Sequence, residues 1–225
     1  MKKTKVACSW SGGKDCAMAL YEAQKSGMVV TRLLNMTTED GSQSRTHGID
    51  ASWLLLQSEA MGIPIIQKAT SWDSYEIIFK EALREIKNNG ITTVIFGDID
   101  LIQHKQWVEK VCYETEITPI LPLWQKEREN LLNLFIESGF RAIITATDAA
   151  YLGEEWLGRE VDKTFVEDMK SLDNIDLCGE KGEYHTFVYN SPIFQKPIKF
   201  SFGNNILYNN NWLLELYHVN YQEIV

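Results

Sequence analysis

The chain has 225 residues, of which 44% are hydrophobic, and it carries a formal net charge of −9 with a pI near 5.0. This composition is typical of a globular protein with one domain, or one domain and an appendage, and its acidic balance makes a nucleic-acid partner unlikely. No apolar run is long enough to span a bilayer and no signal-peptide pattern opens the chain, so we expect a cytoplasmic protein without membrane contact.

Strands and helices alternate through the first two-thirds of the sequence. Short apolar runs predict strands at 6–8, 29–36, 63–66, 93–96 and 142–145, with a further short segment starting at 120. Amphipathic runs predict helices from 17 to the glycine at 27, over 49–61 and 73–89, which end before Gly62 and Gly90, and over 104–116 and 127–138. Glu76 and Lys80 are spaced for an ion pair, and Asp73 with Glu76 for a helix cap.

This alternation predicts an α/β fold, a doubly wound and mostly parallel sheet over residues 1–150. The pattern changes after residue 150, where a helix at 162–172 precedes β-type runs at 186–189, 198–202 and 212–216. Turns are predicted at 203–205 and 209–211. We therefore expect residues 151–225 to form a smaller α+β domain that binds the substrate.

The segment from Ser9 to Cys16 lies between the first predicted strand and the first predicted helix. Two adjacent glycines, Gly12 and Gly13, allow a tight turn that aims backbone N–H groups at one point, and the helix N-terminus adds positive potential. This combination predicts a phosphate-binding loop. A plain strand-to-helix turn, with Asp15 serving the helix start, is the alternative.

The spacing excludes two common phosphate loops. The Walker pattern needs a glycine six positions before the lysine, where Cys8 stands, and a Ser or Thr where Asp15 stands, and the dinucleotide Gly-x-Gly-x-x-Gly pattern is absent. What remains resembles the pyrophosphate loop of the N-type ATP pyrophosphatases, with Cys16 in place of its usual Ser or Thr.

Two further segments carry candidate chemistry. Asp98 follows the strand at 93–96 on the ligand-binding edge, where it could hold Mg²⁺ or form a turn. Glu183 and His185 in the Gly-rich segment 178–186 are spaced to face one side of an extended chain and could handle an amine nucleophile, although a polar hairpin loop would look similar.

Other residues are weaker candidates. Arg45 and His47 could contact phosphate or adenine, and Trp10 could wall the pocket. Arg159 could clamp an anionic substrate, or pair with Asp162 on a helix face.

Together, these segments resemble the diphthine–ammonia ligase family of ATP pyrophosphatases, in its short prokaryotic form. The resemblance rests on the loop, on Arg45–Gly48, on Phe96–Ile99, on Leu157–Arg159 and above all on Cys178–Phe187, and it extends to about residue 198. Lys181 stands where many relatives have Asn.

The resemblance implies an amide ligase that adenylates a carboxylate, releases pyrophosphate and transfers ammonia, with ATP and Mg²⁺ as cofactors. The partners it implies are ATP, an ammonia or amine donor and a carboxylate acceptor on a small molecule or protein side chain; a homodimer is compatible with it. The implied catalytic residues are Lys14, Asp98, Glu183 and His185. The implied nucleotide-binding residues are Ser9, Ser11, Gly12, Gly13, Lys14, Asp15, Cys16, Met36, His47 and Gly97. The implied substrate-binding residues are Arg159, Glu180 and Thr186, and the implied metal ligands are Asp15 and Asp98.

Two other functions share the loop and the fold. A tRNA-thiolating enzyme usually needs a sulfur-carrying cysteine and a basic face; here the net charge is negative and the four cysteines form no Cys-x-x-Cys pair. A nucleotide-binding sensor without turnover would not need the Glu183 and His185 cluster.

Overall fold

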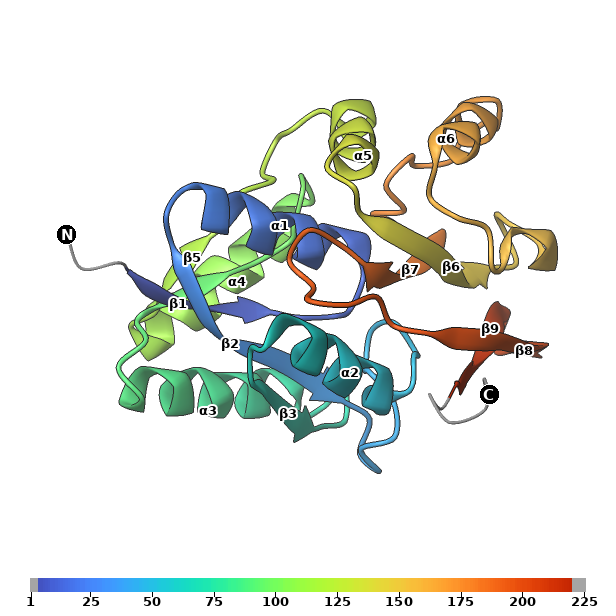
Figure 1. The fold of residues 1–225 in the computed structure, drawn as a ribbon. Helices are drawn as coiled ribbons and strands as arrows, with labels where there is room; N and C mark the ends of the chain where they lie inside the picture. The colour runs from blue at the N-terminus through green and yellow to red at the C-terminus, as the bar shows by residue number, and fades with distance from the viewer. Residues whose placement is uncertain (1–3, 220–225) are drawn as a thin grey trace, which may run out of the picture. The chain divides into compact units, whose positions relative to one another are not determined.

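The computed structural model describes residues 4–219. Contacts within the chain divide it into two compact units, Met1–Glu127 and Arg128–Val225, whose elements are labelled in Figure 1. The boundary lies at Glu127 rather than near residue 150.

The first unit alternates strands and helices, as the sequence predicts. Its elements are β1 (Lys5–Ser9), α1 (Lys14–Lys25), β2 (Val29–Thr37), α2 (Ala51–Met61), β3 (Ile65–Ala69), α3 (Tyr75–Asn88), β4 (Thr93–Ile95), α4 (Ile102–Thr115) and β5 (Thr118–Ile120).

These strands form a parallel sheet in the order β3-β2-β1-β4-β5, so the predicted α/β parallel architecture is confirmed. The order reverses between β1 and β4, because β2 lies on one side of β1 and β4 on the other. Ligands of such sheets bind beyond the carboxyl ends of the strands at this reversal. The loop after β1 and the residues after β4 meet there.

Helices cover both faces of this sheet. Ala7 of β1 belongs to a buried cluster with Phe79 of α3 and Val108 of α4, which places these two helices on its face. Cys8, the next residue, points to the opposite face, where its thiol lies 3.9 Å from the backbone oxygen of Cys16 in α1. The doubly wound prediction is therefore confirmed.

Helix α3 begins differently from the prediction. Its N-cap is Ser74 rather than Asp73, and Ser71 and Ser74 exchange hydrogen bonds, each backbone N–H donating to the other hydroxyl oxygen at 3.0–3.1 Å. The predicted pair of Glu76 with Lys80 is present at 2.5 Å.

Glu76 also fastens α3 to α4. Its carboxylate accepts hydrogen bonds from Lys110 at 2.8 Å and from the Trp107 indole at 3.2 Å. The hydrogen bonds from Lys110 and Lys80 lower the pKa of Glu76 to about 2.

Glu76→Gln is therefore expected to flatten the pH dependence of stability. Because the folded-state pKa lies below the ordinary value of 4.5, the carboxylate contributes stability above that value, which is lost as the pH falls toward 2. A third of the side chain is exposed, so screening keeps the effect small. Urea midpoints at about pH 7 and about pH 3 measure it. The control is Glu81→Gln, the same change at an exposed position of α3. If Glu76→Gln and the unsubstituted chain lose the same stability between these two pH values, the lowered pKa of Glu76 is contradicted.

The second unit is α+β, as predicted for the C-terminal part. Its elements are α5 (Arg128–Glu137), β6 (Arg141–Asp148), η1 (Glu154–Trp156), α6 (Lys163–Lys170), β7 (Tyr184–Asn190), β8 (Phe200–Tyr208) and β9 (Asn211–His218).

The predicted strand at 142–145 is present as β6, but it belongs to the second unit. It pairs antiparallel with β7 and β9 in a sheet of order β7-β6-β9-β8, and α5 packs with α6. These contacts with later elements explain why the boundary precedes α5 and does not follow β6.

The turn predicted at 203–205 is wrong, and the one at 209–211 is correct. Gly203 lies inside β8, at a shift of register between Phe202 and Asn205. A side chain at Gly203 would lie 2.8 Å from atoms of Glu215 and Tyr217, so the glycine serves close packing rather than a turn. Asn209 and Asn210 have positive φ and form the hairpin turn.

Within residues 4–219, the structure has no helix with the length and apolarity needed to cross a membrane.

Candidate functional site

The loop after β1 has the predicted strand-to-helix geometry. Ser9 ends β1, Lys14 begins α1, and Gly13 is the N-cap without a side-chain hydrogen bond. Gly12 has φ of +85°, a backbone conformation that residues with a Cβ rarely adopt. The first helical turn thus begins directly after a glycine pair, which leaves no side chain between its N–H groups and a bound anion.

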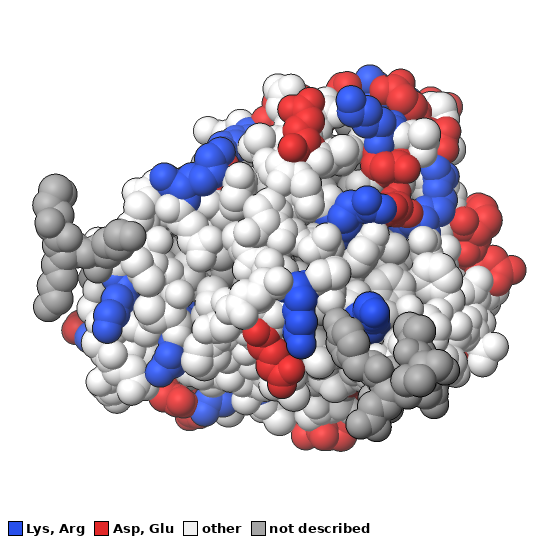
Figure 2. Space-filling view, viewed as in Figure 1, with Lys and Arg blue, Asp and Glu red and all other residues white. Residues whose placement is uncertain are grey.

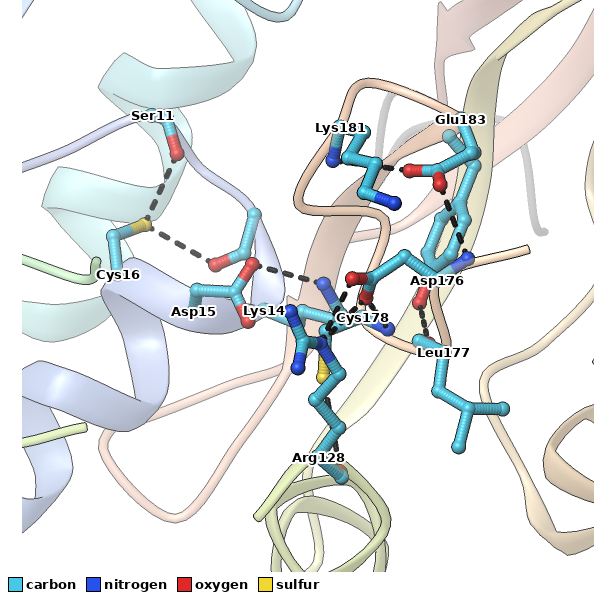
Figure 3. Close-up of polar contacts among 12 residues, drawn as sticks. Ser11, Lys14, Asp15, Cys16, Arg128, Asp176, Leu177, Cys178, Lys181 and Glu183 are labelled. Carbon is cyan, nitrogen blue, oxygen red and sulfur yellow. Dashed lines mark hydrogen bonds and ion pairs between the residues drawn. The ribbon is translucent and has the colours of Figure 1, made fainter. Parts of the chain in front are cut away.

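Lys14 supplies a buried positive charge at this loop. The residue is 4% exposed, and its Nζ lies 2.8 Å from Oδ2 of Asp15 (Figure 3). Burial of an ammonium group costs less free energy when the group is paired with a carboxylate. The ion pair with Asp15 therefore helps to keep the charged Lys14 side chain buried at the start of α1.

Cys16 fits the loop as a neutral donor and acceptor. Its thiol donates to the backbone oxygen of Gly13 at 3.1 Å and accepts from the Ser11 hydroxyl at 3.4 Å (Figure 3). Burial raises the pKa of the Cys16 thiol, while nearby N–H groups of Ser11 and Gly12 oppose the shift. The thiol stays protonated at neutral pH, so Cys16 adds no negative charge to the loop.

Gly97 and Asp98 follow β4 at the same edge of the sheet. A Cβ at Gly97 would lie 2.8 Å from the backbone nitrogen of Cys16 and 2.9 Å from the backbone carbon of Asp15. The missing side chain therefore allows the chain after β4 to pack directly on the first turn of α1. This contact places Asp98 near the loop, with its Oδ1 3.4 Å from Nδ1 of His104.

A cavity of about 300 Å³ opens beside Ser9, where β1 ends. Aromatic side chains from α3, α4 and the end of β4 form most of its wall. The lining residues are Ser9, Thr46, Trp72, Tyr75, Phe79, Phe96, Asp98, His104, Trp107 and Val108.

Ring contacts hold this wall together. The ring centroids of Tyr75 and Trp107 are 5.7 Å apart, and those of Phe79 and Trp107 are 5.1 Å apart. Burial and the nearby Asp98 carboxylate raise the pKa of Tyr75 to about 12, so its hydroxyl remains a donor at neutral pH. A ligand with a flat ring and polar edges would fit such a pocket.

The sequence did not indicate this wall. No local pattern distinguishes Trp72 and Trp107 from core aromatic residues. Trp72 precedes α3, and Trp107 lies in the first half of α4.

The other predicted nucleotide ligands have varied surroundings. Met36 is 5% exposed in the buried cluster under α3 and α4. Its backbone oxygen accepts a hydrogen bond from the backbone N–H of Arg45 at 2.8 Å. The Arg45 guanidinium lies over the Trp72 ring at 4.9 Å, and His47 is half-buried two residues on. Trp10 is buried at 1% exposure, its indole donates to Oε1 of Gln57 at 2.8 Å, and it is not among the lining residues of this cavity, so its place in a pocket wall stays a prediction.

The predicted magnesium ligands are separate carboxylates. No group of three His, Cys, Asp or Glu residues is gathered in a metal-binding arrangement within residues 4–219. Asp15 and Asp98 could serve an ion that binds mainly to substrate phosphates, since Mg²⁺ commonly takes one or two carboxylates and keeps several waters.

In the second unit, Glu183 organises its own loop. It is 1% exposed, and its two carboxylate oxygens accept from the backbone N–H groups of Asp176 and Lys181, each at 3.0 Å (Figure 3). The loop turns at Gly179 and Gly182, both with positive φ. Such a carboxylate fixes the loop conformation.

Arg128 and Asp176 extend this arrangement and were missed in the sequence. The Arg128 Nε donates to Asp176 at 2.9 Å, and the Asp176 carboxylate also accepts from the backbone N–H of Cys178 at 2.8 Å. Nothing in their local sequence distinguishes them from surface charges, and they lie 48 positions apart.

The remaining candidates of this unit lie at two places. Glu180 is half-buried in the same loop, and His185 and Thr186 follow in β7, with Thr186 4% exposed. Arg159 lies elsewhere, stacked at 4.3 Å on Trp156 and donating to Asp168 at 2.5 Å. The close ion pair of Arg159 is thus with Asp168, whereas the Asp162 carboxylate caps α6 by accepting from the backbone N–H of Phe165.

Comparison with known proteins shows one family over nearly all of the chain. The family model for the diphthamide synthase N-terminal domain matches residues 4–119, and that for the diphthamide synthase C-terminal domain matches residues 127–222.

Relatives of this chain share about a quarter of its residues. The diphthine–ammonia ligase of Homo sapiens is 28% identical over 227 residues, which cover 86% of this chain and 82% of that protein. The diphthine–ammonia ligase of Danio rerio is 26% identical over 217 residues, covering 84% and 83%. Among solved structures, PH1313 from Pyrococcus horikoshii aligns with a TM-score of 0.40 and 16% identity, over 60% of this chain and 41% of that one.

Proposed function

The chain belongs to the diphthamide synthase family, and we propose that it is an ATP-dependent amide ligase, forming AMP and pyrophosphate as it joins ammonia to a carboxylate. The observation that carries the assignment is the glycine loop with buried Lys14 at the reversal point of the sheet. Helix N-terminal N–H groups and a lysine there suit the phosphates of a nucleotide.

The aromatic cavity completes the nucleotide site. We assign it to the adenosine part of ATP, because it adjoins Ser9 and offers stacking surfaces together with the Tyr75 hydroxyl and the Asp98 carboxylate. Base stacking on aromatic rings contributes about 1–3 kcal/mol. The loop and the cavity thus divide the nucleotide into a phosphate part and a base part.

The reaction then needs two displacements. An oxygen of the acceptor carboxylate attacks the α-phosphorus of ATP, and the bond to the bridging oxygen breaks, releasing pyrophosphate. Ammonia attacks the acyl carbon, AMP leaves, and the nitrogen gives up a proton as the amide forms. Lys14 and the loop N–H groups stabilise the negative charge that develops on pyrophosphate.

Magnesium is part of this proposal. Asp15 and Asp98 would hold it together with the phosphates, and when bound it would neutralise phosphate charge.

The acceptor and ammonia are assigned to the second unit. Glu180, His185 and Thr186 are proposed to position them, with His185 as the group that takes the proton from nitrogen. Arg159 is proposed to bind an anionic part of the acceptor. Glu183, with both oxygens engaged by loop N–H groups, is assigned to holding this loop in shape.

The relatives are diphthine–ammonia ligases, so diphthine on a translation elongation factor is the first acceptor to test. On the face drawn in Figure 2, Lys and Arg are interspersed with Asp and Glu and form no continuous basic area, so nothing there favours tRNA. None of the four cysteines, at positions 8, 16, 112 and 178, forms a disulfide bond, as is usual in reducing compartments, and we place the reaction in the cytoplasm.

Incubation of the protein with ATP, ammonium and diphthine-bearing elongation factor is expected to release AMP and pyrophosphate in equal amounts. Asp98→Ala and Asp98→Asn are expected to lower turnover by about a hundredfold while retaining ATP binding at the loop. Asp100→Asn, two residues on and outside the cavity lining, is the matched control.

Two results would contradict the proposal. ADP and orthophosphate without AMP would exclude pyrophosphate cleavage. Binding of ATP with no AMP over a long incubation, with each candidate acid, would instead indicate a nucleotide sensor.

A further inference from the structure

Gln57 of α2 is fully buried and reaches the phosphate loop. Its Nε2 donates to the backbone oxygen of Gly12 at 2.9 Å, and its Oε1 accepts from the Trp10 indole at 2.8 Å. A buried amide costs free energy unless it is hydrogen-bonded, and an apolar residue would fill the same space without that cost. The presence of glutamine here calls for a role in the loop itself.

The contact with Gly12 determines the direction of the next N–H group. Every peptide bond among the described residues is trans, so the N–H of Gly13 points opposite to the C=O of Gly12. Gln57 draws that carbonyl toward α2. The N–H of Gly13, the N-cap of α1, is thereby turned away from α2.

A second buried amide acts in the same way two peptides earlier. Asn35 of β2 is 3% exposed, and its Nδ2 donates to the backbone oxygen of Trp10 at 3.0 Å. This bond fixes the peptide plane that carries the N–H of Ser11. The hydroxyl of Ser11 donates to the Cys16 sulfur at 3.4 Å, so this residue is also held against the first turn of α1.

Packing leaves little freedom for another loop conformation. A Cβ on Gly12 would lie 2.9 Å from Oε1 of Gln57 and 3.3 Å from Cδ1 of Leu54. The loop backbone therefore rests directly on α2, at the glycine with positive φ. A change in the Gln57 side chain is felt first by the peptide between Gly12 and Gly13.

We propose that Gln57 is a positioning residue for pyrophosphate binding, which aims the Gly13 N–H at the phosphates by holding the Gly12 carbonyl inward. The inference rests on the proposed function for the identity of the anion. It predicts that the affinity for pyrophosphate depends on Gln57 and that the affinity for adenosine does not.

The test is calorimetric titration of the whole chain with inorganic pyrophosphate and, separately, with adenosine. Gln57→Met keeps the length of the side chain and removes both hydrogen bonds. It is expected to weaken pyrophosphate binding by about 10- to 100-fold, the contribution of one hydrogen bond to a charged group, and to change adenosine binding by less than about twofold. If Gln57 only supported the fold, the substitution would lower the affinities for both ligands together.

Two further variants keep the result interpretable. Gln57→Glu retains the acceptor for the Trp10 indole and loses the donor to Gly12, so it should show the same difference between the two ligands if Gln57→Met does not fold. Ser58→Ala removes the buried 2.6 Å bond from Ser58 to the Ile63 oxygen in the same helix, away from the loop, and should leave both affinities unchanged.

The outcomes separate the two proposals. Unchanged pyrophosphate affinity in folded Gln57→Met or Gln57→Glu, or an equal loss for both ligands, would overturn the role of Gln57. If the unsubstituted protein binds no pyrophosphate, the proposed function fails, and the role of Gln57 falls with it.

Discussion

Lys14→Met is expected to lower the rate of AMP formation by about 10²–10³-fold, because it removes the one side-chain cation of the loop. The charge on the departing pyrophosphate develops in the transition state, so the rate should fall more than ATP affinity. The methionine keeps the aliphatic stem but leaves Asp15 without the partner it has at 2.8 Å. AMP formed in a single turnover, at saturating ATP, measures the effect.

Lys25→Met is the matched control for this substitution. It makes the same change in the last turn of the same helix, at an exposed lysine paired with Glu22 at 3.2 Å. It should leave the rate of AMP formation unchanged. A Lys14→Met protein that forms AMP within about threefold of the normal rate would remove Lys14 from the chemistry.

Gly97→Ala has the second large expected effect. Its new Cβ would lie 2.8 Å from the nitrogen of Cys16 and 2.9 Å from the carbon of Asp15, both backbone atoms of α1 that cannot rotate away. Overpacking of this kind typically costs about 1–3 kcal/mol of unfolding free energy. Relief by movement of α1 would displace the loop, so we expect AMP formation to fall by at least about tenfold.

Gly90→Ala separates the two effects of Gly97→Ala. Gly90 has φ of +79° and open space around its Cβ position, so alanine there strains the backbone by about 1–2 kcal/mol without touching the site. The two variants should lose comparable stability in urea unfolding, and only Gly97→Ala should lose activity. Normal activity in Gly97→Ala would mean that the packing of β4 against α1 does not position the loop.

The sequence predicted the first unit well, because its signals are local. Glycines such as Gly27, Gly62 and Gly90 mark helix ends, and apolar runs such as 93–96 mark buried strands. The loop followed from Gly12, Gly13 and Lys14 at fixed spacing between a strand and a helix. Such features depend on neighbouring residues only.

The errors arose where distant partners decide the structure. The run 142–145 is apolar throughout, as a strand in either kind of sheet would be, and only its pairing with β7 and β9 assigns it to the second unit. Likewise, Asp162 stands three positions after Arg159, as in a pair on a helix face, but Arg159 lies outside α6. Its ion pair is with Asp168, nine positions away, while Asp162 caps the helix.

The candidate site was predicted in part for the same reason. Reactive side chains at motif spacing pointed to Lys14 and Asp98. Gln57, Trp107 and Arg128 instead act through partners that are distant in the sequence, at least 45 positions away for Gln57, 31 for Trp107 and 48 for Arg128. No local pattern reveals a glutamine that holds a loop carbonyl. Its role is visible only once the backbone is folded.

Adenylation of a carboxylate at the glycine loop moves an oxygen atom from the acceptor to AMP, and an isotope label follows that atom. With diphthine labelled with ¹⁸O in its carboxylate, we expect one labelled oxygen in the phosphate of AMP, none in pyrophosphate, and the other in the amide. Label in orthophosphate with ADP as the second product, or unlabelled AMP alongside amide formation, would contradict it.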